Sequence, residues 1–118
     1  MNELVRETLL YDFYGELLTE HQKRIYEEVK LNDMSYSEVA DIENISRQAV
    51  YDMIRRCKDI LEDYETKLQL VERFDQVKEK LDEIQGIIDG LKLRVKDADI
   101  KESLDVLSTK TEEIIENI

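Results

Sequence analysis

The sequence predicts an all-α fold with long C-terminal helices. The chain of 118 residues contains no proline and only three glycines, a composition that favours long helices over turn-rich β structure. Charged residues make up 39% of the chain, which is typical of helical bundles and coiled coils. Apolar residues recur at steps of three and four, the period of a helix with one buried face. We expect a helical core, residues 1–66, and a helical tail, residues 67–118.

Two helices are predicted at the start of the core. The first covers residues 4–18, where apolar and acidic residues are interleaved, with a break expected near Gly15. The second starts after Thr19, which forms a capping-box pattern with Gln22, and ends at the Asn32–Asp33 turn pair. Their apolar faces are expected to complete a small core with Val39, Ile42, Val50 and Ile54.

The segment from Tyr36 to Lys58 has the layout of a helix-turn-helix, two short amphipathic runs around a three-residue turn. Ser35 and Glu38 form a capping-box pattern before the first run. Asn44 stands at the turn, where its tolerance of the left-handed conformation suits a sharp change of direction. Ser46 is a good N-cap for the second helix.

The second helix of this motif is amphipathic. The first run is expected to bury Val39 and Ile42, with Ala40 where the helices cross, and the second to bury Ala49, Val50, Met53, Ile54 and Cys57. The opposite face carries side chains that can donate to or accept from phosphates and base edges: Arg47, Gln48, Tyr51, Asp52 and Arg55.

The candidate nucleic-acid contacts are Ser46, Arg47, Gln48, Tyr51, Arg55, Arg56 and Lys58. Arg47 and Gln48 stand at the helix start, where base edges are usually reached, and suit guanine and adenine. The basic residues that follow suit phosphate. The alternatives are a solvated helix start, ion pairs with nearby acidic residues, and a tyrosine that covers the edge of the core.

Net charge opposes simple nucleic-acid binding, because the chain carries −12 and phosphate repels an acidic surface. The helix that would enter a groove is the exception. Residues 47–58 contain four basic residues and one acidic residue, a local charge of +3. We therefore expect weak non-specific binding with strong salt sensitivity.

The tail carries a coiled-coil-like heptad register. Its first series, which continues to Val95 and Ala98, is Leu70, Phe74, Val77, Leu81, Ile84, Ile88 and Leu91. A second series runs from Ile100 to Ile118, and the phase slips at residues 97–99, where we expect a bend with Asp99 and Glu102 capping the next helix.

Two interpretations of the heptads are open. They pair within one chain as an antiparallel hairpin, or between chains as the seam of a homodimer. We favour the dimer, because a two-fold axis would place two recognition helices on one side. Gly86 and Gly90, which weaken a helix, mark either a close helix crossing or a break.

No enzyme is predicted. His21 is the only histidine and lies in the first turn of an amphipathic helix, and Cys57, the only cysteine, falls on a predicted buried face. The pattern offers no metal site, phosphate loop or cofactor site. We expect no membrane insertion and a cytoplasmic location, since the sequence shows no spanning segment or signal segment and no disulfide pair.

Several strings in residues 3–75 resemble the YlxM-type helix-turn-helix proteins of Gram-positive bacteria. They are residues 13–19 with Gln22, 36–40, 46–52, 60–62, 64–65 and 67–68. The resemblance implies a fold similar to the promoter-reading fourth region of bacterial sigma factors. It also implies that Ser46, Arg47, Gln48, Tyr51 and Arg55 form the recognition face.

Members of that family are encoded beside genes of the signal recognition particle (SRP). The resemblance therefore implies a regulatory or accessory protein of the SRP pathway that binds DNA or RNA, with SRP components as partners. The alternative from a different class is an acidic adaptor whose tail binds a basic protein of that machinery without binding DNA. The sequence decides neither the target sequence nor the partner.

Overall fold

The computed structural model describes residues 1–117. These residues form six α-helices and one short 3-10 helix, without a β-strand among them, so the predicted all-α class is confirmed. The chain divides into two compact units, Met1–Val71 (unit 1) and Glu72–Ile118 (unit 2), which we describe separately.

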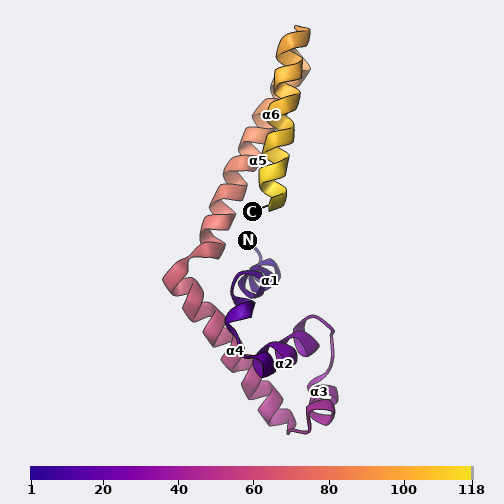
Figure 1. Ribbon diagram of the computed structural model, residues 1–118, viewed down its shortest axis with the longest axis vertical. Helices are drawn as coiled ribbons and strands as arrows, with labels where there is room; N and C mark the ends of the chain where they lie inside the picture. Colours follow the sequence, from indigo (N-terminus) through magenta and orange to yellow (C-terminus); the bar gives the residue numbers. More distant parts are fainter. Residues whose placement is uncertain (118) are drawn as a thin grey trace. The chain divides into compact units, whose positions relative to one another are not determined.

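Unit 1 is a cluster of short helices packed on one long helix. Helix α4 contacts each of the three shorter α-helices, which lie on one side of it in Figure 1. The elements are α1 (Glu3–Tyr14), η1 (Gly15–Leu17), α2 (Glu20–Lys30), α3 (Tyr36–Glu43) and α4 (Arg47–Leu68). The break predicted near Gly15 is confirmed, since α1 ends at Tyr14 and a 3-10 turn follows.

The core of unit 1 is formed by the inward faces of these helices. Its buried apolar residues are Leu10, Tyr14, Leu18, Ile25, Tyr26, Val39, Ala40, Val50, Ile54, Cys57, Leu61 and Val71. The prediction that Ile42 is buried is wrong, since its side chain is 62% exposed. Val39 and Ala40 direct α3 toward the core, and at 3.6 residues per turn Ile42 then lies on the outer side. Ala49 and Met53, also expected in the core, are only partly buried.

The predicted helix caps are confirmed. Thr19 with Gln22, and Ser35 with Glu38, form complete capping boxes, so each pair satisfies two backbone N–H groups. Asn44 adopts the left-handed conformation, with φ 56° and ψ 46°, and ends α3. These local signals fix where α2 and α3 begin and where the chain turns toward α4.

A buried polar network closes unit 1 at its C-terminal end. Helix α4 runs on past Leu61 and ends where Gln69 takes φ 55°. The Tyr14 hydroxyl donates to Glu65 Oε1 (2.6 Å) and accepts from the N–H of Leu70 (3.0 Å). The same Glu65 oxygen accepts from the N–H of Val71 (3.0 Å). The network therefore satisfies the first N–H groups of helix α5 with side chains of α1 and α4.

Unit 2 is an antiparallel helical hairpin of α5 (Leu70–Arg94, whose first two residues belong to unit 1) and α6 (Ala98–Asn117). The two helices run side by side in Figure 1. Gln85 Nε2 donates to Ser108 Oγ (2.8 Å), and Lys92 pairs with Asp105 (2.8 Å). These contacts hold the helices in register.

The cap of α6 differs from the prediction. The carboxylate of Asp97, rather than that of Asp99, accepts hydrogen bonds from the N–H groups of Asp99 (2.9 Å) and Ile100 (3.1 Å). Helix α6 begins at Ala98, so Asp99 already lies inside the first turn and cannot act as its N-cap. The expected bend is present at residues 95–97, and the residue that caps α6 lies two positions before the predicted one.

The hairpin uses part of the predicted heptad seam. Leu81 and Ile88 are buried, as are Leu104, Ser108 and Thr111 on α6. The remaining predicted positions on α5 are exposed or half-buried: Leu70, Phe74, Val77, Ile84 and Leu91. A homodimer through this seam stays a prediction, and it would have to use the positions that the hairpin leaves open.

The two glycines of α5 mark neither a helix break nor a close helix crossing, the two features expected from the sequence. Helix α5 is continuous through Gly86 and Gly90, so neither is a break. A Cβ atom added at either position would meet nothing within 4 Å, so neither is a close helix crossing.

Candidate nucleic-acid interface

The turn between α3 and α4 is fixed by its own hydrogen bonds. The N–H of Ile45 donates to the carbonyl of Ala40 (3.1 Å), across the left-handed Asn44. Ser46 Oγ then accepts from the N–H of Ala49 (3.0 Å), which makes Ser46 the N-cap of α4, as predicted. The turn thus determines the direction in which the first residues of α4 project.

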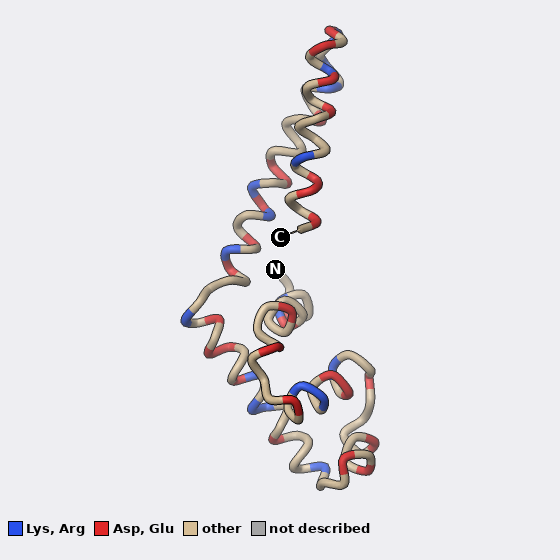
Figure 2. Tube along the Cα trace, viewed as in Figure 1, with Lys and Arg blue, Asp and Glu red and all other residues tan. Residues whose placement is uncertain are grey.

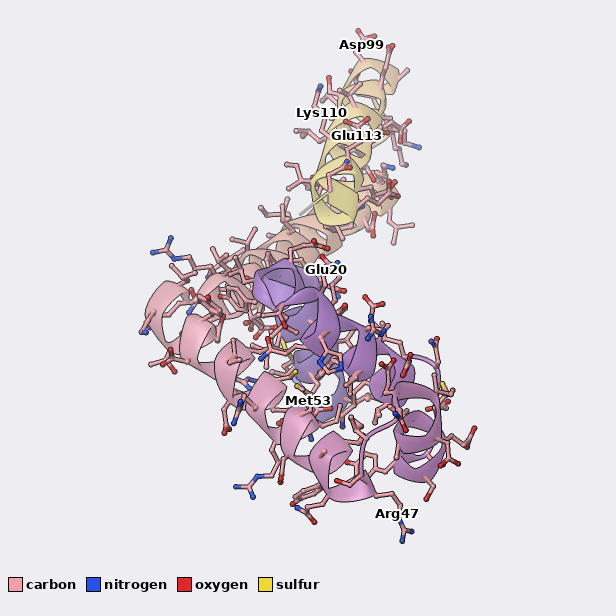
Figure 3. All side chains as sticks on the ribbon, turned by 60° about the horizontal axis from the view of Figure 1, so that its bottom comes forward. Glu20, Arg47, Met53, Asp99, Lys110 and Glu113 are labelled. Carbon is pink, nitrogen blue, oxygen red and sulfur yellow. The ribbon has the colours of Figure 1, made fainter. Side chains whose placement is uncertain are left out.

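The first two turns of α4 present the predicted polar face to solvent. Val50, Ile54 and Cys57 are buried on the opposite side and fix the rotation of the helix. The exposed side chains, which we call the recognition face, are Ser46, Arg47, Gln48, Tyr51 and Arg55. Figure 3 shows Arg47 projecting away from the protein at the start of α4. The structure therefore brings these five predicted residues together on one surface.

Contacts within the recognition face restrict its side chains. Gln48 Nε2 donates to Asp52 Oδ1 (3.0 Å), one helical turn further along. The guanidinium carbon of Arg55 lies 5.9 Å from the centre of the Tyr51 ring, within the range of a cation–π interaction. Arg55 and Tyr51 are therefore partly preorganised, whereas Gln48 must exchange its bond to Asp52 before it can contact a base.

A groove that the sequence did not predict adjoins this face. It has a volume of about 690 Å³ and is lined by Ser35, Tyr36, Ser37, Arg47, Gln48 and Tyr51. The ring of Tyr36 meets that of Tyr51 edge-on, with centroids 6.1 Å apart. The capping box at Ser35 did reveal the start of α3, but its proximity to the start of α4 depends on the geometry of the turn.

Two predicted phosphate contacts lie away from this surface. Lys58 Nζ lies 3.8 Å from a carboxylate oxygen of Glu7 on α1 and is adjacent to Lys30 on α2. Burial, and then the nearby charge of Lys58, lower the pKa of Lys30. Arg56 is exposed but follows Arg47 by nine residues, about two and a half helical turns, so these two side chains point in opposite directions from the axis of α4.

The reactive residue types of unit 1 are held in structural contacts. His21 Nε2 lies 3.9 Å from Glu43, and Cys57 is fully buried, with its Sγ 3.8 Å from the carbonyl oxygen of Gln22. Burial raises the pKa of the Cys57 thiol to about 11, so it is protonated at neutral pH. Among residues 1–117, no group of three His, Cys, Asp or Glu side chains is arranged to hold a metal ion.

Among residues 1–117, no helix is both long and apolar enough to cross a bilayer. Figure 2 shows charged residues along every helix, with acidic residues frequent on both helices of unit 2.

Comparison with known proteins identifies a family. The family described as "Putative helix-turn-helix protein, YlxM / p13 like" (UPF0122) matches residues 1–103. A UPF0122 protein of Thermoanaerobacter sp. (strain X514) is 42% identical over 107 residues, which cover 91% of this chain and 92% of the relative. A UPF0122 protein of Staphylococcus carnosus is 53% identical over 78 residues, which cover 64% and 71%.

Proposed function

The chain belongs to the YlxM / p13-like helix-turn-helix family, and from this premise we propose that it is a regulatory nucleic-acid-binding protein of the SRP pathway. The observation that carries the proposal is the recognition face, five polar side chains grouped at the exposed start of α4. The first residues of the second helix are those that reach base edges in proteins of this motif.

Each residue of the recognition face has a proposed role. Arg47 and Gln48 contact base edges, for which a guanidinium and an amide have matching donors and acceptors. Ser46, Tyr51 and Arg55 contact phosphate and fix the orientation of the helix. The groove beside Tyr36 and Tyr51 gives space for the backbone of the nucleic acid.

Charge limits the strength of this binding. Lys58 lies near Glu7, and Arg56 points in the opposite direction from Arg47. Arg47 and Arg55 are then the two cations of the recognition face. Since Arg47 is assigned to base edges, Arg55 is the one cation assigned to phosphate, which corresponds to a slope of about −1 in log K against log salt. This dependence is shallower than the strong salt sensitivity expected from the sequence. Specific binding must therefore gain from base contacts or from a partner protein.

The proposed role in the SRP pathway rests on the resemblance to YlxM-type proteins described above, which implies an accessory protein of that pathway. The same recognition face offers hydrogen-bond donors to DNA or to RNA. Binding measurements with both nucleic acids decide whether the protein recognises promoter DNA or SRP RNA.

The test is fluorescence anisotropy of the full chain with labelled duplex fragments of its own genome and, in parallel, with SRP RNA at two salt concentrations. We expect the Arg47→Ala/Arg55→Ala variant to bind at least tenfold more weakly, with a salt slope shallower by about one because Arg55 is the cation assigned to phosphate. The matched control is Lys96→Ala/Lys101→Ala, which removes the same charge from unit 2 and should bind as the wild type does. Wild-type affinity in the double arginine variant would refute the site assignment.

A second candidate function is favoured by the net charge of −12. As an acidic adaptor, the protein would bind a basic protein of the SRP machinery through exposed carboxylates of α5 such as Glu79, Asp82 and Glu83. Reversal of these three charges to lysine would abolish that binding and leave the anisotropy signal intact. The arginine variant would have the opposite pair of effects.

A further inference from the structure

The α5–α6 hairpin exposes a regular set of apolar side chains outside its own seam. Three lie on α5 and three on α6, each seven residues from the next. We call them the apolar stripe: Val77, Ile84, Leu91, Ile100, Leu107 and Ile114. Leu91 is partly buried and the other five are exposed by 44–51%. A repeat of seven residues is the spacing at which one helix packs along another.

The two halves of the apolar stripe lie on the same side of the hairpin. Leu81 and Leu104 are buried between the helices, and Ile84 and Leu107 each follow by three residues. Two antiparallel helices are related by a two-fold axis perpendicular to the plane that contains them. Positions displaced in the same direction from the two buried leucines are therefore on one side of that plane.

Charge is segregated around the apolar stripe. Residues 72–118 contain thirteen acidic and eight basic residues, so this part of the chain is acidic as a whole. Yet the charged residues three or four positions from a stripe residue are basic, namely Arg73, Lys80, Arg94, Lys96 and Lys110, with one exception. The exception, Asp97, uses its carboxylate to cap α6. The side of the hairpin that carries the stripe is therefore apolar with a mainly basic border, in which Glu113 lies beside Ile114 and Lys110.

We propose that this side of the hairpin binds an acidic amphipathic helix of another protein, laid along α5 and α6 as a third helix. The stripe on α5 extends over fourteen residues, about 21 Å, so a partner helix of about four turns would cover it. Leucine-like side chains of the partner would fill the line between α5 and α6. Its flanking carboxylates would meet Arg73, Lys80 and Lys110, which are exposed and make no ion pair in the described chain.

The same charges disfavour the other occupants. A second copy of this chain on the same surface would bring two sets of these cations together, and like charges at an interface are repulsive. An anionic membrane would attract the basic border, but the acidic residues on the other sides of both helices oppose adsorption. This surface is separate from the recognition face of unit 1, so the proposal is independent of nucleic-acid binding.

The test uses the full chain and two fluorescein-labelled peptides of eighteen residues with the same leucine stripe. One peptide carries glutamate and the other lysine at the positions that flank the stripe. We expect the glutamate peptide to bind at least tenfold more tightly in anisotropy titrations. Arg73→Glu/Lys80→Glu should remove or invert that preference.

The matched control is Lys78→Glu/Lys101→Glu. Lys78 precedes Leu81 by three residues and Lys101 precedes Leu104 by three, so both lie on the opposite side of the hairpin. This control makes the same change in net charge and should keep the wild-type preference. Ile84→Gln/Leu107→Gln should lose binding at least tenfold while circular dichroism shows unchanged helix content, because the buried leucines are kept.

Three results would overturn the proposal. Equal binding of the two peptides would show that the basic border does not select the partner. Light scattering that finds a wild-type dimer, and a monomer for Ile84→Gln/Leu107→Gln, would identify a second copy as the occupant. Binding of the wild-type chain to phosphatidylserine vesicles, lost in the same variant, together with no binding of the glutamate peptide, would identify a lipid surface.

Discussion

The two units are built from similar amphipathic helices but bury their apolar residues to different depths. Unit 1 contains seven large side chains that are less than 2% exposed: Tyr14, Ile25, Ile54, Leu61, Val39, Val50 and Cys57. In unit 2 the least exposed apolar residues, Ile88, Leu104 and Leu81, are 4–8% exposed, and the apolar stripe is open. Helical periodicity predicts which face is apolar in both units, but it does not say what covers that face.

The largest expected effect is a difference in the loss of unfolding free energy when a buried isoleucine of each unit is replaced by alanine. Ile54→Ala should cost about 4 kcal/mol and Ile88→Ala about 2 kcal/mol of unfolding free energy, because a closed core retains the cavity and a two-helix seam can collapse. All six tyrosines lie between residues 11 and 64, so tyrosine fluorescence reports unit 1 alone, whereas circular dichroism reports both units.

Urea unfolding followed by both probes makes this measurement. Ile54→Ala should shift the tyrosine transition, and Ile88→Ala should shift only the part of the circular dichroism signal that tyrosine fluorescence does not follow. If Ile88→Ala moves both transitions together, the two units unfold as one cooperative structure and the contrast between them fails.

Local signals in unit 1 were sufficient to predict its helix-turn-helix. The caps at Thr19, Ser35 and Ser46 and the left-handed Asn44 act within a few residues of themselves, so the sequence alone locates them. The predicted burial of Ile42 is wrong because, in a helix of only eight residues, tertiary packing and not the sequence pattern decides which face is buried.

What the sequence missed depends on contacts between segments distant along the chain. The groove between Tyr36 and Tyr51 exists because the turn brings two helix starts together. Lys58 lies near the carboxylate of Glu7, fifty-one residues away in the sequence, and so is not part of the recognition face. In unit 2 the heptads left two pairing schemes open, since a repeat of seven fits a partner helix from the same chain or from another.

The next expected effect is a difference in sign between the glycines of the two units. Gly86→Ala and Gly90→Ala should each stabilise unit 2 by about 1 kcal/mol, because the helix is continuous there and an added Cβ meets no atom within 4 Å. Gly15→Ala should destabilise unit 1, since the added Cβ would lie 2.7 Å from the ring of Tyr11. That ring is stacked on Tyr26 (5.0 Å) and its hydroxyl donates to Glu27, so it cannot move freely.

Thermal unfolding by circular dichroism and tyrosine fluorescence separates these changes. Tyrosine fluorescence should show a lower Tm for Gly15→Ala and an unchanged Tm for the α5 variants. A gain in stability for Gly15→Ala would mean that the Tyr11 ring gives way more easily than its two partners suggest.

The smallest expected effect is a pH dependence confined to unit 1. Glu28 lies near Glu43, which accepts two hydrogen bonds from Arg24 (2.8 Å each). Burial, and then the charge of Glu43, raise the pKa of Glu28, and its Oε2 atom is buried without a hydrogen-bond partner. A raised pKa favours the folded state at pH values below the unfolded pKa, about 4.3, and that contribution is lost as pH rises through the folded pKa.

Glu28→Gln should therefore raise the Tm at pH 7, where the wild type keeps a disfavoured charge, and this gain should disappear near pH 3. Since the Arg24–Glu43 pair is present in both proteins, the difference between them isolates Glu28. Asp41→Asn is the control, because it removes the same charge from an exposed position of α3 and should give no comparable gain at pH 7. The same gain at pH 3 and pH 7 would mean that the amide improves packing rather than removing a charge. In that case the carboxylates between α2 and α3 would not give unit 1 a pH dependence of stability that the hairpin lacks.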